Sequence, residues 1–209
     1  MALLYARPVS GPQGFYGQMH QVLRERLLDA ASELICADGW DALGMTQVAR
    51  MVGVSRQAAY KQFSGKAALG EAVVTRETDR VLAGVTSRMR AHGADPVAGI
   101  TAAAGYVLRA AAISPLIKAL LTDGRAGAPG LLPLVTTRPE PVLARAIAAV
   151  AAEAQQCYGA LPIDSQTITR LSEIIVRLTL SHLVQPTGPV DEALAQIRLL
   201  IENALATLA

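Results

Sequence analysis

The sequence predicts an all-α protein with two helical domains. Apolar residues recur at intervals of three and four along most of the chain, which is the period of amphipathic helices, and no stretch alternates as a strand does. Glycine, proline and N-capping residues separate these segments. No internal repeat is present. We expect a flexible arm over residues 1–19, a small N-terminal domain over 20–66 and a larger C-terminal domain over 67–209.

The composition is that of a globular chain. Of its 209 residues, 52% are hydrophobic and 17% are charged, which excludes the disordered and collagen-like classes. Cys36 and Cys157 lie far apart, form no CxxC pair and have no histidines at ligand spacing, so we interpret them as buried or bystander thiols and expect no metal or cofactor. GxSxG, HExxH and glycine-rich phosphate motifs are absent, so we expect no enzymatic activity.

The apolar stretches are too interrupted to predict a membrane-spanning helix. Arg109 interrupts residues 98–113, and an arginine and a glutamate interrupt residues 144–154, whereas a span needs ~20 apolar residues. The first 17 residues contain Arg7 and then proline and glycine, where a signal peptide needs a continuous apolar core. We therefore expect a cytoplasmic protein without a membrane partner.

The N-terminal domain is predicted to form a helix-turn-helix unit. Gly39 ends a first amphipathic helix, and Thr46 is expected to cap the short second helix. Gly53, which tolerates positive φ, and the N-cap Ser55 then separate two short helices by a tight turn. The expected helices span residues 20–37, 47–52 and 56–63.

The positive charge of the chain is concentrated in this unit. Residues 46–66 contain four basic residues and no Asp or Glu, while residues 67–209 contain twelve of each sign. A solvated helix face is the alternative interpretation of such a cluster. The second helix of a helix-turn-helix, however, places its first turn in the major groove of DNA. Arg56 there has the chemistry to contact guanine, and Gln57 to pair with adenine. Groups suited to phosphate oxygens surround them, namely Ser55, Tyr60, Lys61 and Lys66.

Residues 45–69, MTQVARMVGVSRQAAYKQFSGKAAL, resemble the DNA-binding signature of the tetracycline-repressor (TetR) family of bacterial transcription regulators. The preceding ADGW, residues 37–40, also matches the family. Two positions depart from it, because histidine is usual in place of Gln62 and glycine is common in place of Gln57, where a longer side chain would change the operator sequence that is read. The matching positions are Thr46, Val48, Ala49, Gly53, Val54, Ser55, Tyr60, Phe63, Lys66 and Leu69.

The resemblance implies an all-α homodimer with N-terminal DNA-binding heads and a C-terminal domain that binds a small molecule. Ligand binding would shift a two-state equilibrium and release the operator. Arg56 and Gln57 are implied as base readers, and Arg7 either reaches the minor groove or belongs to an unbound tail. The implied phosphate contacts are Thr46, Ser55, Tyr60, Lys61 and Lys66.

The C-terminal domain is expected to bind a lipophilic effector between about residues 97 and 160 and to move the long helix after Lys66. Arg109 or Lys118 would neutralise an acidic head group of the ligand, or would lie exposed. Candidate lining residues, which could equally be ordinary core, are Met89, Tyr106, Leu120 and Leu121. The expected helices span residues 67–91, 97–113, 114–121, 140–156, 165–184 and 190–208, with a loop over 122–133.

The last two helices are apolar around much of their circumference, so they need cover on two sides. We expect a homodimer in which these two helices of each chain form a four-helix interface. His182 is interpreted as an interface residue, with a pH sensor as the alternative. The predicted interface residues are Ile168, Leu171, Ile175, Leu178, His182, Ile197 and Ile201.

These observations favour a dimeric repressor that binds a palindromic operator on double-stranded DNA and is released by a small lipophilic effector. Two alternatives remain open at this point. One is an activator, or a regulator controlled by a protein partner. The other is a helical dimerisation scaffold, which would have no DNA affinity and no salt dependence of binding.

Overall fold

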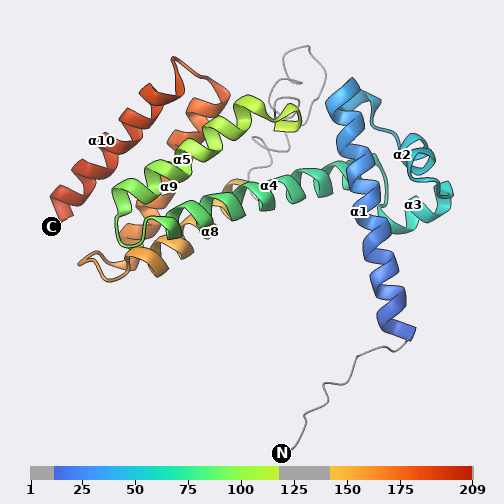
Figure 1. Cartoon of the computed structure of the whole chain (residues 1–209), viewed down its shortest axis with the longest axis horizontal. Helices are drawn as coiled ribbons and strands as arrows, with labels where there is room; N and C mark the ends of the chain where they lie inside the picture. The colour runs from blue at the N-terminus through green and yellow to red at the C-terminus, as the bar shows by residue number, and fades with distance from the viewer. Residues whose placement is uncertain (1–11, 118–141, 209) are drawn as a thin grey trace, which may run out of the picture. The chain divides into compact units, whose positions relative to one another are not determined.

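The computed structural model describes residues 12–117 and 142–208, and every regular element within these ranges is helical (Figure 1). The all-α class predicted from the apolar spacing is therefore confirmed. Contacts within the chain divide it into two units after Val73, each with its own core.

The first unit is a small bundle built on one long helix. Helix α1 packs against η1, α2 and α3, and α2 also packs against α3. Its elements are α1 (Pro12–Asp38), the 3-10 turn η1 (Trp40–Ala42), α2 (Met45–Val52), α3 (Arg56–Gln62) and the first turns of α4 (Lys66–Ala91). The most deeply buried residues of this unit are Leu27, Ala31, Ile35, Val48, Ala59, Leu69 and Val73.

Helix α1 begins at Pro12, so residues 12–19 are helical and do not belong to the predicted flexible arm. The proline and glycine residues near the N-terminus predicted irregular structure there. A proline is nevertheless tolerated in the first turn of a helix, because the N–H that it lacks would have no hydrogen-bond partner at that position. Gly17 stands inside the helix in open space, where it costs about 1 kcal/mol of helix propensity. Residues 1–11, including Arg7, lie outside the described part of the chain.

Helix α2 begins before the predicted cap. Its N-cap is Gly44, which has extended backbone and makes no side-chain cap hydrogen bond, while Thr46 lies exposed in the first turn. Met45 is only 5% exposed, so starting the helix there buries an additional large side chain. That burial is worth more than the ~1 kcal/mol that a threonine cap typically contributes.

The second unit is a helical domain in which α9 packs against α8, α5 and α10, and α5 packs against α10 and α8. Helices α9 and α10 have the predicted bounds. Of the short helix predicted over 114–121, only residues 114–117 are described, of which 115–117 are helical, and the predicted loop over 122–133 lies outside the described ranges. The elements of this unit are the rest of α4, α5 (Pro96–Ile113), α8 (Val142–Tyr158), α9 (Ser165–Val184) and α10 (Val190–Leu208).

Small residues let the helices of this unit approach closely. The hydroxyl of Tyr158 on α8 lies directly against Gly99 on α5, where any side chain would collide with it. Tyr158 is 4% exposed, and burial raises the pKa of its phenol to about 12. Its oxygen has no hydrogen-bond partner among the described residues.

Helix α5 is long and apolar enough, by length and composition, to cross a membrane, which corrects the expectation that Arg109 would prevent this. It is the one helix of the described ranges that meets this test. Within the fold its apolar residues serve helix packing, because it contacts α8, α9 and α10. Its buried residues are Gly99, Ala103, Ala104, Gly105, Leu108 and Ala111.

The division between the units falls inside α4, after Val73, whereas the sequence places it after Lys66. Leu69 and Val73 are completely buried and belong to the first unit. Gly70 between them lies against the ring of Trp40. The first turns of α4 therefore close the core of the N-terminal head.

We expect Gly70→Ala to lower the melting temperature, because a β-carbon there would overlap the Trp40 ring. Overpacking of this kind typically costs about 1–3 kcal/mol. The matched control is Gly17→Ala, which also lies inside a helix but in open space, and should gain about 0.5–1 kcal/mol. Thermal unfolding followed by circular dichroism compares the two. Equal stability of both variants would show that Trp40 moves aside without cost.

Candidate nucleic-acid interface and apolar cavity

The turn between α2 and α3 is fixed by one glycine and one serine. Gly53 adopts φ 75°, in the left-handed region, and its N–H donates to carbonyls in the last turn of α2. The Ser55 hydroxyl oxygen then accepts a hydrogen bond of 3.1 Å from the backbone N–H of Ala58. Both roles agree with the sequence prediction. They set the direction in which α3 leaves the turn.

Helix α3 turns one side towards the core and its charged side chains towards solvent. Ala59 and, just after the helix, Phe63 are at most 4% exposed, in a core that also contains Val48, Ala49 and Leu27. The guanidinium of Arg24 on α1 lies 4.4 Å from the centroid of the Phe63 ring. The solvent-facing residues on and before this helix include Ser55, Arg56, Gln57, Tyr60 and Lys61.

Arg56 and Tyr60 contact one another on the exposed face of α3. The guanidinium carbon of Arg56 lies 5.3 Å from the ring centroid of Tyr60, and its Nη2 donates to the Tyr60 hydroxyl at 3.5 Å. Such contacts restrict the rotamers of a long side chain. Arg56 is therefore partly ordered at the start of the helix before any ligand arrives.

Lys66 differs from the other predicted contacts because it is half-buried. Its ammonium donates to the carbonyl of Asp41 at 3.1 Å and lies 5.0 Å from the centroid of the Trp40 ring. An ammonium has three donors, so one further acceptor could be bound without breaking this contact.

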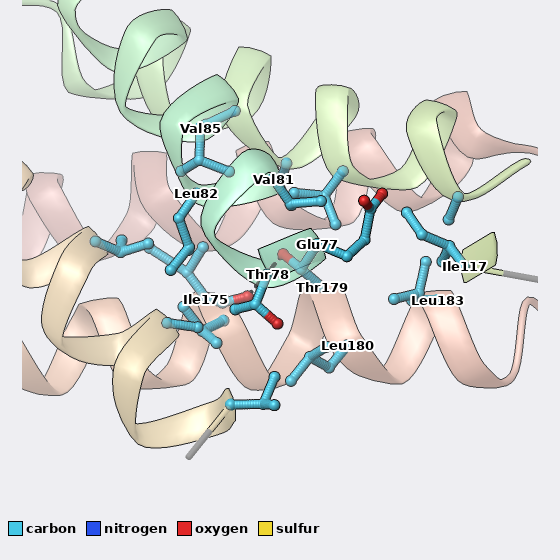
Figure 2. A pocket seen from close by; sticks show the side chains of 18 of the residues that line it. Glu77, Thr78, Val81, Leu82, Val85, Ile117, Ile175, Thr179, Leu180 and Leu183 are labelled. Carbon is cyan, nitrogen blue, oxygen red and sulfur yellow. Dashed lines mark hydrogen bonds between the residues drawn. The ribbon is translucent and has the colours of Figure 1, made fainter. Parts of the chain in front are cut away.

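The second unit contains a cavity of about 170 Å³ between α4, α5, α8 and α9 (Figure 2). Almost all of its wall is aliphatic, and the side chains from α5 and α8 are mostly small. The aliphatic lining includes Val81, Leu82, Val85, Ile100, Ala103, Ala104, Val107, Ala111, Ala146, Val150, Ile175, Val176, Leu180 and Leu183.

Among the described lining residues three are polar, namely Glu77, Thr78 and Thr179. Each threonine hydroxyl donates to a carbonyl one turn earlier in its own helix, Thr78 to Val74 and Thr179 to Ile175, both at 2.8 Å. Glu77 extends from α4 on the same side of the view as Ile117 and Leu183. It is the one charged residue of the described lining.

A bidentate ion pair joins α4 to α8. Nε and Nη2 of Arg90 each donate at 2.6 Å to the carboxylate of Glu153, which is 4% exposed. The Cys157 thiol also donates to this carboxylate, at 3.4 Å. Hydrogen bonding from Arg90 holds the pKa of Glu153 below its usual range, and burial together with Glu153 raises the pKa of Cys157. Neighbouring residues on both helices, Met89 and Val150, line the cavity.

Two families match consecutive parts of the chain. Residues 27–73 match the family described as bacterial regulatory proteins, tetR family, and residues 95–203 match the bacterial tetracyclin repressor C-terminal domain. The second match alone spans more than half of the chain. The chain belongs to the TetR family. It is accordingly a DNA-binding transcriptional regulator, as its helix-turn-helix and charge distribution predicted.

Similar proteins include several TetR regulators. The HTH-type transcriptional regulator AlkX of Mycobacterium tuberculosis is 29% identical over 86% of this chain and 83% of its own length. The HTH-type transcriptional activator FasR of Mycolicibacterium smegmatis is 40% identical over 32% of this chain and 31% of its own. The crystal structure of the TetR family repressor AlkX from Dietzia sp., implicated in biodegradation of n-alkanes, superposes with a TM-score of 0.71 at 23% identity, covering 88% of this chain and 95% of that one.

The predicted ligand residues of this TetR chain fall in different places. Met89 is fully buried and lines the cavity. Tyr106 and Arg109 do not line it and border a surface depression, where the guanidinium of Arg88 stacks 3.8 Å from the Tyr106 ring centroid. The other candidates, Lys118, Leu120 and Leu121, lie outside the described residues.

The cavity also extends beyond the predicted range of about 97–160, because α4 and α9 supply much of its wall. The missed residues of α4 do carry a signal, since its apolar positions recur at three and four along one face. The missed lining residues on α4 include Val74, Thr78, Val81, Leu82 and Val85.

Most of the predicted dimer residues are instead core residues of their own chain. Ile168, Ile175, Ile197 and Ile201 are all at most 8% exposed within one protomer, so their side chains have no surface to offer a partner. Leu171 and Leu178 are half-buried. His182 is half-buried too, its Nε2 has no partner among the described residues, and it borders the connection from α9 to α10. The apolar faces of α9 and α10 that the sequence predicted to contact a partner chain therefore face the interior of their own chain.

We expect stability to fall on acidification through loss of the Arg90–Glu153 pair. A carboxyl whose pKa is lower in the folded than in the unfolded state stabilises the fold above its unfolded pKa of about 4.3 and loses that contribution as pH falls through its folded pKa. Glu153→Gln removes this titration, so its melting temperature should be lower near neutral pH and should fall less steeply below about pH 4.

The control is Glu173→Gln, which removes a carboxylate paired with Arg177 on the exposed face of α9. Its melting curve should follow the wild type at every pH, because exposed pairs contribute little. Parallel pH dependence of wild type and Glu153→Gln would contradict a stabilising role of the buried carboxylate.

Proposed function

We propose that this protein is a transcriptional repressor that binds a palindromic operator as a homodimer and is released by a small lipophilic effector. The exposed face of α3 carries this proposal. It presents Arg56, Gln57, Tyr60 and Lys61 together in a segment without any acidic residue, while its opposite face is locked into the core.

Arg56 and Gln57 stand in the first turn of α3, the part of a recognition helix that reaches base edges. Arg56 suits guanine and Gln57 suits adenine. The contact with Tyr60 reduces the number of rotamers that Arg56 must give up on binding. Exposed hydroxyls and cations nearby fit phosphate oxygens, and these are Thr46, Ser55, Tyr60 and Lys61, with the remaining donors of Lys66 as a further contact.

The cavity in the second unit suits an apolar effector, because burying aliphatic surface there contributes ~25 cal/mol per Å². Helix α4 lines this cavity with Val81, Val85 and Met89, and its first turns belong to the core of the head. A ligand that repacks the cavity would therefore act on the helix that carries Lys66. The relation to a Dietzia repressor implicated in n-alkane biodegradation supports a lipophilic ligand.

We place the dimer interface on the outward faces of α9 and α10. Ile174 on α9 is 47% exposed and Leu199 on α10 is 60% exposed, although both are large aliphatic residues. The two helices pack against each other, so these faces can form two of the four helices of a symmetric interface. The relatives are DNA-binding regulators, and we propose that this protein likewise acts in the cytoplasm.

The direction of regulation has one alternative supported by a specific relative. The transcriptional activator FasR is 40% identical to this chain over 67 residues. A reporter gene behind the selected operator separates the two functions, since deletion of the regulator raises expression under a repressor and lowers it under an activator.

We expect Arg56→Ala to lose sequence preference and to retain weak binding that depends on salt. A well-placed bidentate contact with a base is worth ~1–3 kcal/mol of discrimination. The matched variant Lys61→Ala should weaken binding to all duplexes alike and reduce the salt slope by about 1. Fluorescence anisotropy with a duplex selected from random DNA, and with its scrambled counterpart, measures both at several salt concentrations. If Arg56→Ala distinguished the selected duplex from the scrambled one as well as the wild type does, Arg56 would not be a residue that contacts the bases.

We expect Leu199→Asp to weaken the dimer by about tenfold or more, because it places a charge in an apolar interface. Ile113→Asp on α5 is the control, since Ile113 is also exposed, at 80%, and lies outside the proposed interface. Sedimentation equilibrium gives the dimer dissociation constant of each. If both variants dimerise as the wild type does, the interface lies elsewhere.

A further inference from the structure

The polar groups in the wall of the cavity share one property, which is that they only accept hydrogen bonds. Glu77 presents a carboxylate, which has no donor. The hydroxyl hydrogens of Thr78 and Thr179 are used by the carbonyls of Val74 and Ile175, so only their oxygens remain for a ligand. The remaining side chains of the described lining are aliphatic, apart from the weakly accepting sulfur of Met89. Among the described lining residues, a ligand in this cavity finds acceptors and no side-chain donor.

Glu77 also carries the only negative charge of the described lining. Its side chain is 18% exposed and pairs with Arg80, one turn along α4. The two charged groups are 3.7 Å apart, and the Arg80 side chain is 61% exposed and does not line the cavity. This long, exposed pair leaves Glu77 facing the cavity as a strong acceptor. A ligand carboxylate placed beside it would be repelled and would find nothing to donate to it.

The volume limits the size of the ligand. An engineered apolar cavity of about 150 Å³ binds benzene. The cavity here measures about 170 Å³, which is enough for six to eight non-hydrogen atoms by the same comparison.

We propose that the effector is a small amphiphile whose aliphatic part fills the cavity and whose polar end donates a hydrogen bond to Glu77. This inference rests on the proposed function, in that it takes the cavity as the effector site. The class includes alkyl alcohols and alkyl amines and excludes the corresponding carboxylates. Glu77 is then the residue that determines head-group specificity, while the aliphatic wall sets chain length.

The test compares four probes of matched size on the full-length protein, namely hexan-1-ol, hexylamine, hexanoate and n-heptane. Calorimetric titration gives each dissociation constant, and the rise in melting temperature provides an independent measure. We expect hexanol and hexylamine to bind at least about tenfold more tightly than hexanoate, because a hydrogen bond to a charged acceptor is worth about that factor. Heptane should bind more weakly than hexanol.

Glu77→Gln keeps the size of the side chain but supplies an amide donor and removes the charge. In this variant hexylamine should lose about tenfold in affinity and hexanoate should gain by a similar factor. Glu173→Gln, which lies on α9 outside the cavity, should leave the order of the four probes unchanged. The melting temperature without ligand confirms that each variant is folded.

The outcomes separate this inference from the proposed function. Hexanoate binding as tightly as hexanol in the wild type, or an order of affinities that Glu77→Gln does not alter, would overturn the role of Glu77. If hexanoate bound as tightly as hexanol and also released the operator duplex, the repressor mechanism would stand and only the head-group assignment would fail. If none of the four probes bound or released DNA, the cavity would lose its role as the site of this class of effector and the inference would fall, while operator binding would still be decided by Arg56→Ala.

Discussion

Helix α4 has to satisfy two cores at once, one in each unit of the chain. Its first turns bury Leu69 and Val73 in the N-terminal unit, and its later turns bury Val85 and Met89 in the C-terminal one. Protein interiors are close-packed, so a buried helix face moves only when its neighbours repack. The helix that lines the cavity is thus also a structural member of the N-terminal unit.

The exposed face of α3 and the cavity of the second unit differ in how their polar groups are placed. On α3 the polar groups stand in water, where Arg56 and Lys61 are free of acidic neighbours in sequence and their charge extends outward. Around the cavity the polar groups are few and their hydrogens are already committed within the helices, as in Thr78 and Thr179. In the proposed function, the first arrangement attracts a polyanion of any sequence and then selects among bases. The second binds an apolar group and, by the further inference, selects its head group.

The head was predictable in detail because its signals are local. A left-handed glycine at Gly53 and a serine cap at Ser55 fix the turn through their own backbone, with little help from distant residues. The start of α2 was missed because burial of Met45 outweighs the cap that Thr46 offered. In the second unit, a helix that is apolar all round does not reveal which side faces its own chain. The periodicity identified Ile175 and Ile197 as a seam but could not show that this seam is internal.

The cavity owes its volume to alanine. Ala103, Ala104, Ala111 and Ala146 contribute to its wall from α5 and α8, and the same small side chains let those helices approach their neighbours. Because each of these alanines borders the empty volume, exchanging one for valine or leucine would fill part of the cavity. The N-terminal unit and the turn between α2 and α3 would be unaffected. On the proposed role of the cavity, the range of ligands can therefore change in evolution through single substitutions, while the operator stays the same.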